Sequence, residues 1–152
     1  MKKTILDPDA GSGLFDDIDT AYSRGVMVEA PGYRRLFLSG VTSTEEAFSD
    51  EYEMSIYEQT KDALARIEAF LDEFGADMDD VVRVRVYVED LSEDDFPEIH
   101  RARSEFFDRE HYPASSLLEV EGVLLGRIEI ECEVVIPDDG WEVESIESDV
   151  LG

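Results

Sequence analysis

Two stretches of the chain alternate between apolar and polar residues, and this pattern constrains the fold more than any other feature of the sequence. The first stretch places Arg83, Arg85 and Tyr87 between Val82, Val84, Val86 and Val88. The second places Arg127, Glu129, Glu131 and Glu133 between Ile128, Ile130, Cys132 and Val134. A period of two predicts strands that bury one face. The chain must therefore build a sheet that is apolar on one side.

Two segments show helical spacing instead. The first helix is predicted by Tyr57, Leu64, Ile67, Leu71 and Phe74, which recur at intervals of three, four and seven before a C-terminal Gly75. The second is predicted after Asp94, with Pro97 in its first turn and Ile99, Ala102 and Phe106 on its apolar side. Short strands are also predicted on both sides of Pro31-Gly32 and around Leu118 and Val120.

The resulting order, β-β-α-β-α-β-β, predicts an α+β fold of two layers. Strand–helix–strand connections are right-handed, so both helices should pack on one face of a mixed sheet. Two helices leave nothing to cover the opposite face, which favours burial of that face against other subunits. We expect one domain over residues 20–137, a loose lead-in over 1–19 and an acidic tail over 138–152.

The charge of the chain excludes several classes of partner. It carries 39 acidic against 13 basic residues, a formal net charge of −26. Neither nucleic acid nor an anionic membrane is expected to bind such a surface. Uniform acidity with scarce lysine resembles the proteins of salt-in halophiles, because molar salt screens self-repulsion. We therefore expect a halophilic archaeal source and a melting temperature that rises from dilute buffer to molar KCl.

Searches for familiar chemical motifs give little. Cys132 is the single cysteine, and neither a secretory signal nor an apolar run long enough for a membrane span is present, so we expect a cytoplasmic protein. His100 and His111 lack metal-ligand spacing, and no phosphate-binding loop occurs, so no metal and no cofactor are expected. A nucleophilic Ser115 or Ser116 with His111 as base is disfavoured, because the elbow sequence of hydrolases is missing.

A set of segments, each weak alone, becomes specific when their order and gaps are considered together. They are Ala21-Tyr22-Ser23-Arg24-Gly25-Val26, Leu36-Phe37-Leu38-Ser39-Gly40, Gln59-Thr60, Val84 to Asp90, Phe106-Phe107, Pro113-Ala114-Ser115-Ser116 and Ile128 to Glu131. Through them the chain resembles the Rid family (RidA/YjgF, the reactive-intermediate deaminases, formerly called endoribonuclease L-PSP). The resemblance covers about residues 20–136.

The resemblance implies a chorismate-mutase-like fold and a homotrimer with three clefts between subunits that bind small carboxylated metabolites. In the deaminases of this family, an arginine directly after Pro-Ala holds the carboxylate of a 2-imino acid by two parallel hydrogen bonds. A tyrosine and a glutamate hold the attacking water, and the products are ammonia and a 2-oxo acid. Carried over to this chain, the resemblance makes Tyr22 and Glu129 the catalytic candidates and places Ser39 and Gly40 against the ligand.

The chain departs from the family at the carboxylate-binding position, where Ser115 follows Pro113-Ala114. A serine has no charge with which to neutralise a carboxylate, so the chain looks like a divergent member without this arginine. Arg24 and Arg127 are the cations available as replacements, and Arg127 has an alternative role as an ion-pair partner of Glu129 two residues away. His100 stands where deaminases often have asparagine, as a proton donor or acceptor in the cleft or as a structural residue.

Two functional hypotheses remain open at this point. In the first, the protein binds, or also hydrolyses, a small imine-like, enamine-like or related carbonyl metabolite at the clefts, and Ser115 disfavours plain 2-imino acids. In the alternative, it is a non-catalytic trimeric ligand-binding or chaperone-like protein. Tyr22 then becomes a packed aromatic residue and Glu129 a solvated carboxylate.

Overall fold

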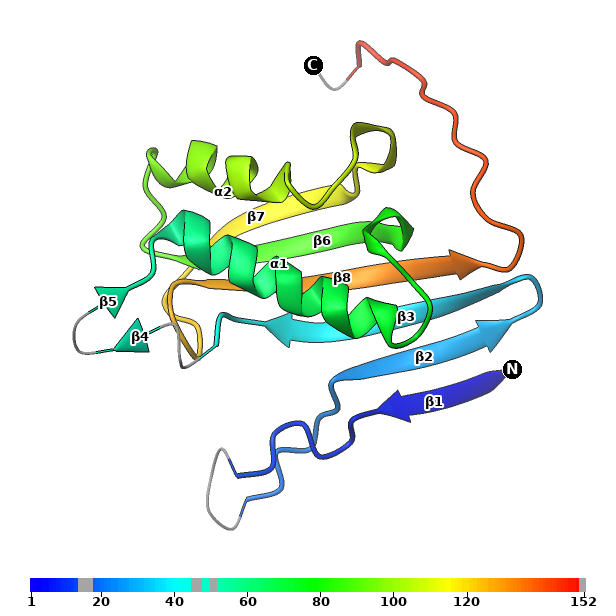
Figure 1. Cartoon of the computed structure of the whole chain (residues 1–152), viewed down its shortest axis with the longest axis horizontal. Coiled ribbons are helices and arrows are strands. Elements are labelled where there is room, and N and C mark those ends of the chain that lie inside the picture. Colours follow the sequence, from blue (N-terminus) through cyan, green and yellow to red (C-terminus); the bar gives the residue numbers. More distant parts are fainter. Residues whose placement is uncertain (14–17, 45–47, 50–51, 151–152) are drawn as a thin grey trace.

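One mixed sheet of six strands forms the rear layer of the molecule in Figure 1. The computed structural model describes residues 1–13, 18–44, 48–49 and 52–150. The strands are Lys2–Leu6 (β1), Gly25–Ala30 (β2), Tyr33–Val41 (β3), Val81–Glu89 (β6), Ala114–Val120 (β7) and Ile128–Pro137 (β8). Their order is β1-β2-β3-β8-β6-β7, in which β6 and β7 pair in parallel and the other neighbours pair antiparallel.

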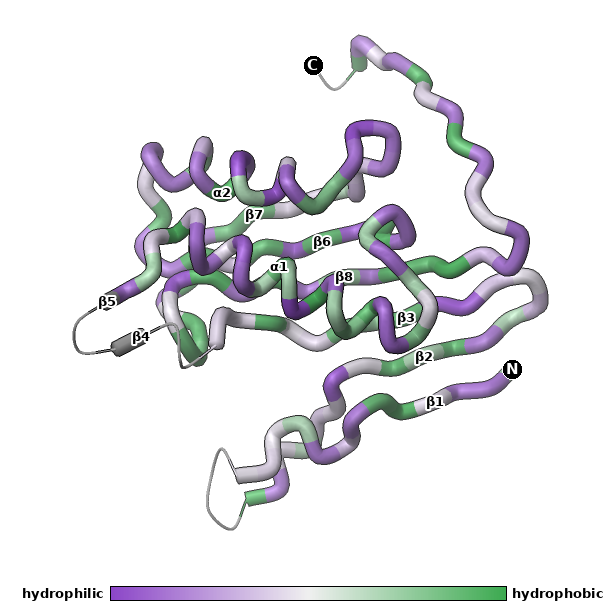
Figure 2. Tube along the Cα trace, in the orientation of Figure 1, coloured by the Kyte–Doolittle hydropathy of each residue, from purple (hydrophilic) through white to green (hydrophobic). Residues whose placement is uncertain are grey.

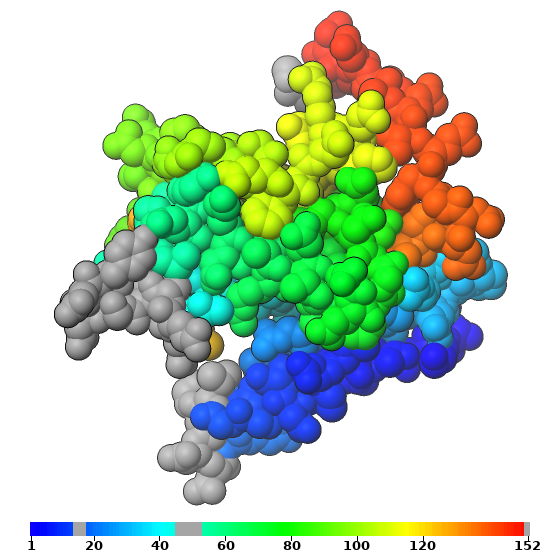
Figure 3. All heavy atoms as spheres, in the orientation of Figure 1, coloured from blue at the N-terminus to red at the C-terminus, as the bar shows by residue number. Residues whose placement is uncertain are grey.

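Both long helices pack on the same face of this sheet, so the predicted two-layer α+β fold is confirmed. Helix α1 (Ile56–Asp72) starts with a capping box, in which the side chains of Ser55 and Glu58 bond each other's backbone N–H groups. Helix α2 (Asp95–Arg103) lies beside α1, and the space-filling view in Figure 3 shows the two covering the sheet. Short 3₁₀ turns span Met78–Asp80 (η2) and Arg109–His111 (η3).

The core lies between the helices and the apolar side of the sheet, as the alternating pattern predicts. Leu64, Ile67 and Leu71 of α1 are at most 1% exposed and meet the inward side chains of β6 and β8. Figure 2 shows the same division, because hydrophobic positions alternate along the central strands and the outer faces of the helices are hydrophilic. Cys132 is buried within this core, as expected for a small apolar side chain.

One part of the strand prediction is wrong. Val82 was expected on the buried face with Val84, but it is 36% exposed, and Val81 is buried instead. The cause is a register shift between Val81 and Arg83 where β6 pairs with β8. A bulge of this kind adds one residue to one strand and moves the following side chains to the other face.

Two β elements were not anticipated from the sequence. Strand β1, within the expected lead-in, pairs with β2 along the edge of the sheet. The strands Phe48–Ser49 (β4) and Tyr52–Glu53 (β5) form a separate hairpin just before α1. At the other end, residues after β8 run away from the body of the molecule, and Trp141 ties them back by donating a hydrogen bond to Asp80.

The face of the sheet opposite the helices is open in the single chain. Arg85 joins Glu131 and Glu133 there with two N···O distances of 2.9 Å, and Tyr87 donates to Glu131. Phe37 and Leu118 on this face are 38% and 46% exposed. Among the described residues, no helix has the length and apolar character needed to cross a membrane.

Candidate functional site

The fold brings most of the predicted site residues to one place, a trough around Gly40. Two adjoining pockets share Tyr22, Gly40 and Glu129 in their linings. The first, about 540 Å³, also takes in Arg24, and the second, about 630 Å³, takes in Ser39. We call these two pockets together the Gly40 trough. Residues that are far apart in the sequence therefore meet beside the end of β3.

Glu129 lies directly against the backbone of Gly40. A Cβ atom built on Gly40 would come within 1.9 Å of Oε1 of Glu129, so a side chain at this position would displace the carboxylate. The pairing of β3 with β8 shifts between Leu38 and Val41, which moves this stretch of β3 out of the regular ladder. Glycine is thus required because the backbone approaches the carboxylate closely.

The carboxyl group of Glu129 is half-buried and has no cationic partner among the described residues. Desolvation, and then repulsion from Glu131, raise its pKa above the usual 4.5. A carboxyl group with a raised pKa is a better proton acceptor than a solvated one when it is ionised. The environment of Glu129 therefore differs from that of a fully solvated surface carboxylate.

Tyr22 is held by residues that precede the predicted domain. A Cβ atom on Gly11 would come within 2.5 Å of the Tyr22 ring and 2.1 Å of the Thr20 hydroxyl, so this segment packs tightly against both. The carbonyl of Asp7 accepts from the N–H of Arg24. The hydroxyl of Ser39 donates to the carbonyl of Ser23 at 2.7 Å. Ser39 thus helps to position the segment that carries Tyr22.

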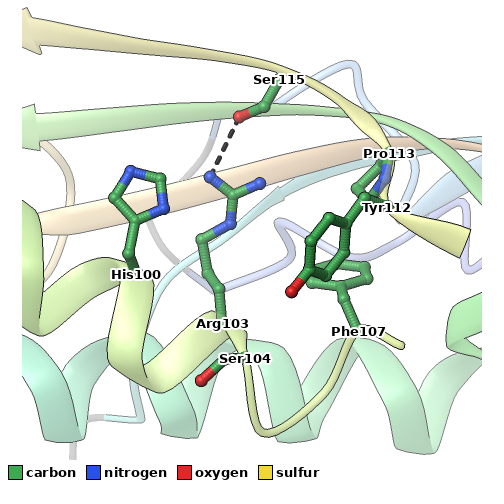
Figure 4. Close-up of a pocket in the computed structure, with 7 residues that line it drawn as sticks. All are labelled: His100, Arg103, Ser104, Phe107, Tyr112, Pro113 and Ser115. Carbon is green, nitrogen blue, oxygen red and sulfur yellow. Dashed lines mark hydrogen bonds between the residues drawn. The ribbon is translucent and has the colours of Figure 1, made fainter. Parts of the chain in front are cut away.

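Two of the three remaining predicted residues, His100 and Ser115, line a separate pocket between α2 and β7. Its volume is about 280 Å³, and Phe107, Tyr112 and Pro113 form its apolar side. Figure 4 shows Arg103 extending from the end of α2 into the middle of this pocket, between His100 and the aromatic rings. Nη1 of Arg103 donates to Oγ of Ser115 at 3.0 Å. We call this the Arg103 pocket.

Arg103 was missed by the sequence analysis, although it brings a guanidinium to the serine at position 115. It forms no ion pair with any described carboxylate, and its guanidinium stacks loosely on Phe107 with 5.9 Å from Cζ to the ring centre. Desolvation lowers the pKa of Arg103. The available signal was helical spacing, because Arg103 follows buried Ile99 by four positions and so lies on the inward side of α2.

His100 is an exposed residue of α2 that nevertheless borders the Arg103 pocket. Desolvation, and then the charge of Arg103, lower the pKa of its imidazole. His100 is therefore neutral over a wider pH range than a free histidine. In that state it can accept as well as donate a hydrogen bond.

Arg127 has a structural role in this chain and lines neither the trough nor the Arg103 pocket. It was expected to pair with Glu129 or to bind ligand, but its Nη2 meets Oδ2 of Asp95 at 2.8 Å. The same guanidinium donates to the carbonyls of Glu89 and Asp90. Its backbone N–H donates to Gln59 of α1. Among the described residues, no group of three or more potential metal ligands is present.

Comparison with known proteins identifies the fold and the family. The model of one protein family, described as Endoribonuclease L-PSP, matches residues 17–136, which include the Arg103 pocket and all of the Gly40 trough except Ala10. The chain belongs to the endoribonuclease L-PSP (RidA/YjgF) family.

Two named proteins are similar to this chain in sequence. The chain is 36% identical over 85 residues to a RutC family protein of Pyrococcus abyssi, a match that spans 56% of this chain and 65% of that protein, slightly under two thirds. It is 31% identical over 116 residues to a 2-iminobutanoate/2-iminopropanoate deaminase of Dermatophagoides farinae, spanning 76% of this chain and 85% of the deaminase.

Solved structures of the family share the fold. A member of the YjgF/YER057c/UK114 family from Mycobacterium tuberculosis superposes with a TM-score of 0.66 at 28% identity, covering 89% of this chain and all of that one. A protein of unknown function from Pseudomonas aeruginosa gives a TM-score of 0.71 at 25% identity, covering 90% of this chain and 94% of that one. The expected RidA/YjgF-type α+β fold is therefore confirmed.

Proposed function

We propose that the protein hydrolyses a small imine, or a related enamine or carbonyl metabolite, with Glu129 as the general base. The observation that carries this proposal is the position of Glu129, which is desolvated, lies against Gly40 and shares the trough with Tyr22. The similarity to a named imine deaminase supports the same reaction.

The proposed step uses one water molecule and no other reactant. Glu129 accepts a proton as the water oxygen attacks the carbon of the protonated imine, which forms a tetrahedral amino alcohol. The carboxylic acid then returns this proton to the nitrogen, and the C–N bond breaks as the C=O bond forms. The Glu129 carboxylate takes up the hydroxyl proton in this step, and the ammonia that leaves carries it away as ammonium. The phenol of Tyr22, on the same trough, orients the water or the nitrogen by a hydrogen bond.

The replacement of arginine by Ser115 does not remove a guanidinium from the site in this proposal. Arg103 donates to the Ser115 hydroxyl, and the remaining donors of its guanidinium are available to a ligand carboxylate. Arg103 has no competing carboxylate among the described residues, in a chain with three times as many acidic as basic residues. The Arg103 guanidinium can therefore bind the carboxylate of a plain 2-imino acid, and plain 2-imino acids become candidate substrates.

The complete site requires more than one copy of the chain in this proposal. The Gly40 trough and the Arg103 pocket have no lining residue in common. The open sheet face, with exposed Phe37 and Leu118, offers a surface for assembly. A homotrimer would bring the Arg103 pocket of one subunit to the trough of the next. Sedimentation in molar KCl tests this, and a monomer under those conditions would contradict it.

A direct assay tests the proposed reaction. Imines such as 2-iminobutyrate are generated in place by an amino-acid oxidase, and their decay is followed with and without the protein. We expect acceleration by the wild type and at least about a hundredfold loss in Glu129→Gln, the usual range for removing a general base. Glu68→Gln, on the exposed side of α1, is the matched control. If the wild type gives no acceleration but binds the corresponding 2-oxo acids, the non-catalytic alternative is favoured.

A further inference from the structure

The Gly40 trough is electrically polarised along its length. On one side of Glu129 and Tyr22, the lining includes Arg24 and Arg66, and on the other it includes Asp19 and Glu131. We call these the cationic end and the acidic end. No carboxylate other than Glu129 lines the cationic end, within the described part of the chain. A ligand with separated charges would therefore bind in a single orientation.

The two arginines of the cationic end have no carboxylate partner in the part of the chain that the structure describes. Neither Arg24 nor Arg66 forms an ion pair with a described carboxylate, although the chain has 39 acidic residues. Arg66 uses one Nη1 hydrogen bond to hold the carbonyl of Thr42 at 2.5 Å. Its other N–H groups remain available, because a guanidinium carries five donors. Both side chains also line a second small pocket beside Leu38, which places them near each other.

Ser43 provides an independent sign of a missing ligand. It lines the cationic end, is 1% exposed, and its Oγ is a buried side-chain atom with no hydrogen-bond partner in the described structure. A buried hydroxyl without a partner costs free energy, and such groups are uncommon in folded proteins. A ligand oxygen held by Arg24 and Arg66 would accept a hydrogen bond from this hydroxyl.

This anion-binding end is distinct from the Arg103 pocket, so one ligand can use both. Under the proposed function, the Arg103 pocket holds the carboxylate adjacent to the imine carbon. Arg24 and Arg66 line the trough and not that pocket, so they remain available to another anionic group of the ligand. A second acidic group on the same ligand would fill this position and receive bidentate hydrogen bonds.

We infer that the substrate is an imino acid with a second carboxylate, of the kind formed from an acidic amino acid, and that Arg24, Arg66 and Ser43 bind this second group. The inference rests on the proposed function for the reaction itself. The acidic end of the trough fits the same orientation, because Asp19 attracts the protonated imine nitrogen and the ammonium product, whereas Glu131 is already paired with Arg85. Hydrolysis consumes one water and releases ammonia and a 2-oxo dicarboxylate, so no other reactant is needed.

The test compares ligands that have two carboxylates with ligands that have one, in both binding and turnover. For binding, the probes are succinate and butyrate, which have equal numbers of carbon atoms and differ by one carboxylate. For turnover, they are the imines produced from glutamate and from 2-aminobutyrate by the matching oxidases. All measurements use the full chain at one fixed ionic strength, because exposed charges are screened by salt. We expect succinate to bind at least about tenfold more tightly than butyrate.

Three variants locate the second carboxylate. Arg66→Ala and Arg24→Ala should each weaken succinate binding by about tenfold and leave butyrate binding unchanged. Ser43→Ala should weaken succinate by about threefold without lowering the melting temperature, because the substitution removes a buried hydroxyl that has no partner. Arg109→Ala is the matched control, since Arg109 is exposed on η3 and lines neither the trough nor the Arg103 pocket.

The outcomes separate this inference from the proposed function. Equal binding of succinate and butyrate, or a preference that persists in Arg66→Ala and Arg24→Ala, would overturn the inference. If 2-iminobutyrate is hydrolysed as fast as the glutamate-derived imine, the proposed reaction stands and the acidic substrate class is wrong. If neither imine is hydrolysed but the succinate preference depends on Arg66, the second-carboxylate site stands and the reaction is wrong.

Discussion

Asp95 and Glu129 are two shielded carboxylates near the start of β8, and their pKa values are shifted in opposite directions. Burial raises the pKa of Asp95, but hydrogen bonds from Arg127 and from Ser92 outweigh it, so the net shift is downward. The pKa of Glu129 is raised by desolvation and by Glu131, and no cation offsets either effect. Asp95 is thus kept ionised as part of the scaffold, and Glu129 is left able to exchange a proton.

The arginines repeat this contrast. The guanidinium of Arg127 is occupied by Asp95 and two backbone carbonyls. Among the described residues, that of Arg103 has a hydrogen bond to the Ser115 hydroxyl and a loose contact with Phe107, but no carboxylate. In a chain with a net charge of −26, a shielded arginine without a carboxylate partner is unexpected unless a ligand supplies one. Charged groups that are paired within the chain therefore indicate a structural role, and shielded charged groups without a partner among the described residues indicate the candidate site.

The largest effect is expected from Gly40→Ala, which displaces the carboxylate of Glu129 and leaves that of Asp95 in place. The new Cβ overlaps the Glu129 side chain, and a displacement of about 1 Å in a catalytic group can cost roughly a hundredfold in rate. Gly122→Ala is the control, since its Cβ would meet Glu89 no closer than 3.6 Å. Imine hydrolysis measured beside the melting curve checks this, and full activity in Gly40→Ala would contradict the assigned role of Glu129.

The next effect is a loss of stability in Arg127→Ala. This change leaves Asp95, whose side chain is 10% exposed, without its cation and removes bonds that join β6, β8 and α2. We expect the free energy of unfolding to fall by about 2–3 kcal/mol, below the range for fully buried pairs because Arg127 is partly exposed. Denaturant unfolding measures it. Lys2→Ala, which breaks an exposed pair, should cost less than about 1 kcal/mol.

Arg103→Ala should show the reverse pattern, with binding lost and stability kept. Removing an arginine that has no ion pair among the described residues breaks the bond to Ser115 and a loose contact with the Phe107 ring. We expect binding of a small monocarboxylate such as butyrate to weaken about tenfold and the melting temperature to change little. Titration calorimetry and a melting curve together decide the matter. A large loss of stability with unchanged binding would place Arg103 in the scaffold beside Arg127.

The smallest effect concerns the pH dependence of stability at Glu129. Because its folded pKa is raised, the folded state binds more protons than the unfolded state between pH 4.5 and the folded value. Stability is therefore lost as the pH rises through that window and stays lower at neutral pH. Glu129→Gln should raise the melting temperature at pH 7.5 by up to about 3 °C. A shift of this size corresponds to a change of ~1 kcal/mol in the free energy of unfolding for a chain of this length.

The gain in Glu129→Gln should disappear below pH 4.5, where the carboxyl group is protonated in both states. Asp95→Asn is the opposite control. The lowered pKa of Asp95 contributes stability above pH 3.8 that is lost as the pH falls through the folded value, so the asparagine variant should lose stability mainly at neutral pH. Identical pH profiles for the two variants would remove the contrast between these carboxylates.

The parts of the fold that follow from short-range periodicity were predictable. Alternation places the inward side chains of β8 correctly, and helical spacing identifies Leu64, Ile67 and Leu71 as core. Val82 was misplaced because a register shift depends on pairing with β8, which the local pattern does not record. Strand β1 was missed because its few residues carry no strong alternation and gain their order from the edge of β2.

The site divides in the same way. Tyr22, Gly40 and Glu129 were found through motifs whose order along the chain is specific. Arg103 was not found, because the family motif marks position 115 and not position 103. Nothing in the sequence indicates that a guanidinium twelve residues earlier reaches the same serine. The cationic end of the trough was equally hidden, since Arg24 and Arg66 belong to different elements.

The sequence by itself determined the α+β architecture, the family and the acidic character of the surface, because periodicity, motif order and composition are all properties of the chain as written. Only the tertiary structure decided which charges are neutralised. Arg127 pairs with Asp95, whereas Arg103, Arg66 and Glu129 are left without counter-ions among the described residues. The reason is physical: ion pairing depends on distances of a few ångströms between segments far apart in the chain, which folding alone sets.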